Sequence, residues 1–85
     1  MSNKVMSRFL HLSELAMKVN TYTEHDVFIT FSGHVNHMVI HYNKDGYKYG
    51  ESNKVTLFDI YAGYESEKDI LKVFNAAEKK LIALM

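Results

Sequence analysis

Three histidines, His34, His37 and His41, are the residues whose type and spacing most resemble a chemical site. They form an H-x2-H-x3-H pattern, and zinc accepts three neutral imidazoles as ligands. The pattern lies in a segment with strand periodicity. There, four residues span roughly 13 Å, so His37 and His41 stand too far apart to hold one ion. We therefore predict no metal site here and expect exposed or locally hydrogen-bonded histidines.

Catalysis would need nucleophilic or titratable groups brought together in a pocket. Asp59 lies among apolar residues and could face His37 or His41, but a solvated cross-strand pair accounts for it. Ser32, Ser52 and Ser66 are better explained as turn or cap residues. The four glycines form no loop that could cradle a phosphate. The sequence therefore predicts a protein that is not an enzyme and carries no cofactor.

Size and composition predict one folded domain that comprises residues 1–85. Hydrophobic residues make up 47% of the chain, which excludes a disordered protein. Without cysteine the chain can form neither a disulfide nor a thiolate metal site, as is usual in a reducing cytoplasm. No apolar run reaches the roughly 20 residues of a membrane span, and Arg8, His11 and Glu14 interrupt any signal-peptide core. We expect a cytoplasmic protein with no membrane partner.

Two segments have apolar residues at steps of three and four, the spacing of one helical face. In the first segment these residues are Val5, Phe9, Leu12, Ala16 and Val19. In the second they are Ile70, Phe74, Ala77, Leu81 and Leu84. The first spacing predicts a helix over about 4–19, with Ser2 or Asn3 as its N-cap. The second predicts a helix that begins after Ser66, because Ser66 followed three residues later by Asp69 resembles a capping box.

Between these helices, apolar and polar residues alternate as in half-buried antiparallel strands. The alternation predicts strands over 26–31, 38–42 and 55–61. A hairpin at 43–46 could add residues 47–49 as a fourth strand. The predicted fold class is α+β, with the order α-β-β-β-α. It has two layers, in which both helices cover one face of a three-stranded or four-stranded antiparallel sheet.

The opposite face of this sheet would be left open, because two short helices cover only one side. In the third strand, either Thr56, Phe58 and Ile60 or Val55, Leu57, Asp59 and Tyr61 must face outward. Large uncovered apolar surfaces usually mark an interface, although scattered surface aromatics are the alternative. We predict homodimerisation or binding to another protein through this face. The predicted contacts are His37, Val39, His41, Leu57 and Tyr61.

A second hypothesis is that aromatic residues interleaved with lysines bind single-stranded nucleic acid, since such surfaces stack bases. The candidate residues are Lys44, Tyr47, Lys48, Tyr49 and Lys54. Ten basic and ten acidic residues cancel, however, and phosphate binding usually needs an electropositive surface. The balance of charge therefore favours a protein partner over a nucleic acid.

Two resemblances bear on function. The α-β-β-β-α order resembles that of double-stranded RNA-binding domains, but the second helix begins with the acidic segment Glu65-Ser66-Glu67-Lys68-Asp69, which would repel phosphate. The RNA-binding function is therefore rejected. Residues 31–46, with FSGHVN at 31–36 followed by Val39, Tyr42 and Gly46, are similar to small phage and prophage accessory proteins. This similarity implies an accessory protein that acts on host or phage machinery, and it implies no enzymatic activity.

Overall fold

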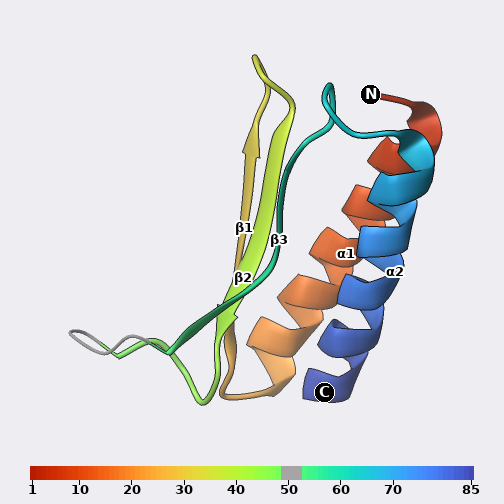
Figure 1. The fold of residues 1–85 in the computed structure, drawn as a ribbon. Helices are drawn as coiled ribbons and strands as arrows, with labels where there is room; N and C mark the ends of the chain where they lie inside the picture. The colour runs from red at the N-terminus through yellow and green to blue at the C-terminus, as the bar shows by residue number, and fades with distance from the viewer. Residues whose placement is uncertain (49–52) are drawn as a thin grey trace.

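The computed structural model describes residues 1–48 and 53–85 (Figure 1). Its elements are α1 (Asn3–Tyr22), β1 (Asp26–Ser32), β2 (His37–Asn43), β3 (Lys54–Tyr61) and α2 (Glu67–Leu84). The strands form one antiparallel sheet in the order β1-β2-β3, so the predicted α-β-β-β-α order is confirmed. In the described part of the hairpin segment, Tyr47 and Lys48 are irregular and form no fourth strand. Tyr49, which the predicted strand included, lies outside the described residues.

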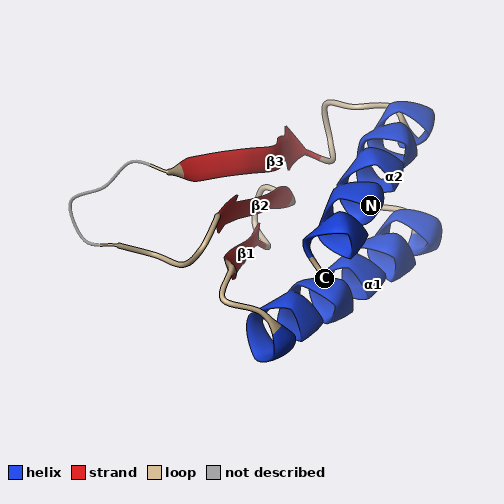
Figure 2. Cartoon of the chain, turned by 90° about the horizontal axis from the view of Figure 1, so that it is seen from below, coloured by secondary structure: helices blue, strands red, loops and turns tan. Residues whose placement is uncertain are grey.

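Both helices lie on one side of the sheet, as Figure 2 shows. α1 packs against α2 and β1, and α2 also packs against β3. The two layers therefore follow from the amphipathic helices, each of which buries one stripe of side chains. Among the described residues, neither helix combines the length and apolarity that a membrane span requires.

Side-chain caps start both helices where the sequence predicts them. The Ser2 hydroxyl accepts a hydrogen bond from the Val5 amide at 3.1 Å. The Ser66 hydroxyl accepts one from the Asp69 amide, also at 3.1 Å. Each cap satisfies an amide that has no partner within the helix. α1 continues to Tyr22, beyond the predicted end, because no glycine or proline interrupts it.

The core lies between the two layers. Its largest fully buried side chains are Phe74, Leu12, Met38, Ile40, Leu81, Val5 and Val19. Three phenylalanines join the layers: the ring of Phe9 on α1 lies 6.3 Å from that of Phe58 on β3 and 6.1 Å from that of Phe74 on α2. Rings at such distances in tilted arrangements add to the stability given by burial alone.

A β-bulge sets which side chains of β3 face outward. Ile40 pairs with Phe58, but the next residue of β2, His41, pairs with Thr56, so Leu57 is the extra residue. Phe58 is buried among the core residues, whereas Thr56 lies opposite His41 on the other face. Neither of the two alternative patterns predicted for this strand holds along its whole length, because a bulge inverts the alternation at one point.

The neighbouring residues Leu81 and Ile82 provide a test of this packing. Leu81 is fully buried, whereas Ile82 is 52% exposed. Leu81→Ala should lower the free energy of unfolding by about 2–5 kcal/mol, because a cavity would replace the buried side chain. Ile82→Ala should change it by less than about 0.5 kcal/mol. Urea denaturation measures both values, and similar losses for the two variants would contradict the described core.

Candidate binding surface

The sheet face that points away from the helices carries a row of aromatic and imidazole rings. None of the described elements covers this face, which we call the open face. According to the strand register, its residues are Phe28, Thr30, His37, Val39, His41, Thr56, Asp59 and Tyr61. Most of them are exposed or half-buried ring-bearing or small polar residues. Val39 is its aliphatic residue, so the predicted uncovered surface is aromatic rather than aliphatic.

One group of rings, the Phe28 cluster, comprises Phe28, His41 and Tyr47. Phe28 and His41 are opposite each other on β1 and β2, and their rings stack with centroids 4.8 Å apart and planes 14° apart. Tyr47 meets Phe28 edge-on at 6.2 Å. The Tyr47 amide donates a hydrogen bond to the Asp26 carboxylate at 2.6 Å, which holds the segment after β2 beside the start of β1. Asp26 thereby positions a loop tyrosine at the rim of the sheet.

A second group, the Tyr61 cluster, comprises His37, Asp59, Tyr61 and Tyr64. The His37 and Tyr61 rings stack almost in parallel, with centroids 4.2 Å apart. Tyr64 meets Tyr61 edge-on at 6.2 Å. The Asp59 carboxylate lies 2.5 Å from Nε2 of His37 and is largely exposed, so this is the solvated cross-strand pair that the sequence indicates. The rings of His37, Tyr61 and Tyr64 therefore each contact a neighbouring ring before any partner binds.

The environment of His41 disfavours its charged form. Burial lowers the pKa of the His41 imidazole from its ordinary value of 6.5, and the nearby positive charge of Lys54 lowers it further. Nδ1 of His41 is buried and has no hydrogen-bond partner among the described groups. The lowered pKa favours the neutral imidazole, so the His41 ring stacked on Phe28 presents a flat, uncharged surface beside the charge of Lys54.

The structure brings together four of the five predicted contacts. His37, Val39, His41 and Tyr61 share the open face. Leu57 does not belong with them, because at the bulge it packs against the hydrophobic core. The prediction placed Leu57 with Asp59 and Tyr61 by counting every second residue, and the bulge breaks that count.

Sequence reasoning left Phe28 and Tyr64 out of the predicted contacts. Phe28 is 38% exposed on the open face, and the alternation within β1 already indicated that it points away from the helices. Tyr64 follows β3 in a turn, where no periodicity applies, and its position became evident only from its ring contact with Tyr61.

The residues of the nucleic-acid hypothesis lie near the Phe28 cluster. Lys44, Lys48 and Lys54 are exposed, and Tyr47 belongs to the cluster itself. Tyr49 lies outside the described residues. In the strand register Lys54 lies two residues before Thr56, the partner of His41, so at least one lysine adjoins the stacked rings.

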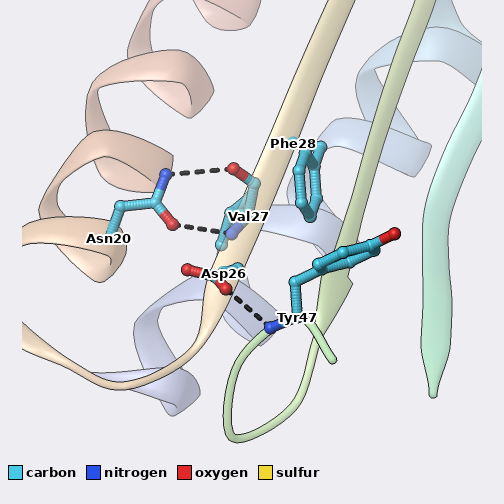
Figure 3. A pocket seen from close by; sticks show the side chains of 5 residues that line it. All are labelled: Asn20, Asp26, Val27, Phe28 and Tyr47. Carbon is cyan, nitrogen blue, oxygen red and sulfur yellow. Dashed lines mark hydrogen bonds between the residues drawn. The ribbon is translucent and has the colours of Figure 1, made fainter. Parts of the chain in front are cut away.

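A shallow pocket of about 380 Å³ adjoins the Phe28 cluster at the start of β1 (Figure 3). Its lining residues are Asn20, Asp26, Val27, Phe28 and Tyr47. The Asn20 carboxamide donates a hydrogen bond to the Val27 carbonyl at 3.0 Å and accepts one from the Val27 amide at 2.6 Å. The helix side chain thus occupies the backbone groups of the strand and fixes this end of β1 against α1.

The three histidines of the H-x2-H-x3-H pattern remain apart. His37 and His41 belong to different clusters, and His34 lies in the turn between β1 and β2. Across residues 1–48 and 53–85, no three histidine, aspartate or glutamate side chains are grouped so that they could hold a metal ion. Comparison of the chain with protein-family models, curated proteins and solved structures finds no match. Function is therefore inferred from the open face itself.

We expect His41 to make folding sensitive to acid. Because its pKa is lowered in the folded state, the unfolded state binds the proton first, and the free energy of unfolding falls as the pH drops through 6.5. His41→Gln should remove this contribution and give a shallower decline between about pH 7 and pH 5. His34→Gln, a change in the exposed turn, keeps the His41 contribution. Urea denaturation at several pH values measures the slopes, and parallel curves for the wild type and His41→Gln would contradict this assignment.

Proposed function

We propose that this chain is a non-catalytic binding protein that contacts a partner protein through the open face. The observation that carries the proposal is the presence of two stacked ring pairs, Phe28 with His41 and His37 with Tyr61, on one uncovered side of the sheet. Tyrosine and other aromatic residues are enriched at protein interfaces. Rings that are already stacked lose little side-chain entropy when a partner orders them.

The arrangement of the open face suits a protein partner. Val39 lies on β2 between His37 and His41, and therefore between the two ring clusters. An apolar residue flanked by aromatic anchors resembles the centre of an interface, where most of the binding energy is concentrated. Lys54, at the start of β3, supplies a charge at the periphery, where polar residues are usual, and Asp59 lies opposite Val39 on β3. The phage or prophage role implied by residues 31–46, and a cytoplasmic location, stay predictions.

Site-specific photo-crosslinking tests the proposal. A benzoylphenylalanine placed at Tyr61 on the open face should capture a discrete protein in cells that express the chain. The same group at Tyr22, which is 77% exposed on α1, should not capture that protein. The captured protein is then purified and titrated with the chain. Val39→Glu should weaken its binding by about 10-fold or more, because it buries a charge at the centre of the interface.

Ile82→Glu is the matched control, because Ile82 is an exposed apolar residue on α2, away from the open face. It should leave the affinity unchanged. Identical crosslinks at Tyr61 and Tyr22, or equal affinities for Val39→Glu and Ile82→Glu, would remove the open face as the contact surface.

Single-stranded nucleic acid is the second candidate partner. It is favoured by the closeness of Lys54 to His41, which puts a positive charge beside rings on which bases could stack. The zero net charge of the chain weighs against it. We expect a fluorescein-labelled oligothymidine not to bind even at about 50 mM salt, where phosphate contacts are strong. Binding that falls steeply with salt, and that Lys54→Ala weakens more than Lys72→Ala on α2, would replace the protein partner with a nucleic acid.

A further inference from the structure

The free edge of β1 carries backbone groups that no described side chain occupies beyond Val27. The amide and carbonyl of Val27 point away from β2, since both bond to Asn20. In an antiparallel strand this orientation repeats at every second residue, so the backbone groups of Ile29 and Phe31 point outward too. Asn20 closes one end of this edge and leaves the part from Ile29 to Phe31 available to another strand.

The two edges of the sheet differ in their protection. β3 has the bulge at Leu57 and carries Lys54 and Asp59, which are devices that discourage strand pairing. β1 has no charged residue from 27 to 33, and its register with β2 is unbroken. Natural proteins rarely leave such an edge unpaired. The asymmetry singles out β1 as the edge that takes a partner.

An apolar surface on α1 runs alongside this edge. Met6, Leu10 and Met17 are 47%, 61% and 62% exposed, and their spacing places them on one line of the helix. Met6 and Leu10 line an apolar groove of about 250 Å³ together with Met1, Phe9 and Phe31. Phe31 is 49% exposed, although it points to the helix side of the sheet. We call Met6, Leu10 and Met17 the α1 stripe.

We propose that a second copy of this chain docks here, with its β1 antiparallel to the first and a two-fold axis through Thr30. In this register Ile29 of each copy pairs with Phe31 of the other, and each such pair exchanges two hydrogen bonds. The open segment is symmetric about Thr30, so it is complementary to itself, as a two-fold interface requires. A longer register would meet Val27, whose backbone groups Asn20 already holds.

The position of the α1 stripe along its helix is consistent with a two-fold axis at Thr30. Asn20 is level with Val27, to which it bonds, and Phe9 is level with Phe31, whose ring lies 6.2 Å away. Thr30 is therefore level with the middle of the α1 stripe. The same two-fold axis then brings the two α1 stripes together in antiparallel orientation, so that Met6 of one copy faces Met17 of the other.

The surface that this arrangement removes from water is large enough for a dimer. The exposed parts of Met1, Phe31 and the α1 stripe amount to roughly 500 Å² per copy, given that side chains of this size have about 200 Å² each. Two copies would bury about 1,000 Å² before the strand backbones are counted, which reaches the lower range of specific interfaces. The chain has no net charge, so a second copy meets no overall repulsion.

Sedimentation equilibrium of the full chain, from about 1 to 500 µM, tests the dimer over the usual range of weak to moderate affinity. We expect the wild type to dimerise and Leu10→Glu to raise the dissociation constant at least about 100-fold, because it buries a charge near the axis. Ile82→Glu introduces the same charge at another exposed apolar residue, on α2, and should leave the constant within about 3-fold. A strict monomer, or equal effects of the two variants, would overturn the proposal.

Amide hydrogen exchange followed by NMR tests the register separately. The amides of Ile29 and Phe31 should be protected in the dimer and exchange rapidly in Leu10→Glu. The Val27 amide should stay protected in both, because Asn20 holds it within one copy, and it thereby reports that the variant is folded. Unprotected Ile29 and Phe31 amides in a wild-type dimer would reject pairing through β1.

This dimer is independent of the proposed function. If Val39→Glu separated the copies while Leu10→Glu did not, the copies would pair through the open face, and the edge proposal would be rejected. If Leu10→Glu separated the copies while each copy still bound the crosslinked partner, both proposals would stand. If Val39→Glu lost partner binding while its dimer stayed intact, both proposals would likewise stand.

Discussion

The structure depends on one constraint: a sheet has two faces, and two helices of this length can cover only one of them. On that side the buried stripes of both helices pack against the sheet, and Phe9, Phe58 and Phe74 join the two layers. The other side of the sheet stays in contact with water. It does so with rings that stack in pairs, which reduces the apolar area exposed without burying it completely.

Much of this arrangement could be predicted from the sequence, because burial imposes a period on it. The helical steps of three and four, the serine caps and the alternation in β1 and β2 reflect local rules, and the structure bears them out. The outward face of β3 could not be predicted, since the bulge at Leu57 depends on how β3 pairs with β2. Tyr47 is similar: Asp26, far away in sequence, holds its amide in place.

The candidate site was predictable only in outline. Counting alternate residues found His37, Val39, His41 and Tyr61, but contact between rings on different strands depends on register. The neutral state preferred by His41 likewise arises from burial and from Lys54, which lies on another strand. His41 is a polar residue, yet in its neutral state it contributes to a surface that is largely uncharged. Composition alone does not reveal this contribution.

The bulge in β3 has a further consequence for assembly. If copies join through β1, each copy has one adhesive edge and one edge that the bulge and its charges make inert. A pair consumes both adhesive edges, and no edge is left on which a third copy could add. The extra residue at Leu57 would thus stop the assembly at two copies and prevent its growth into a filament.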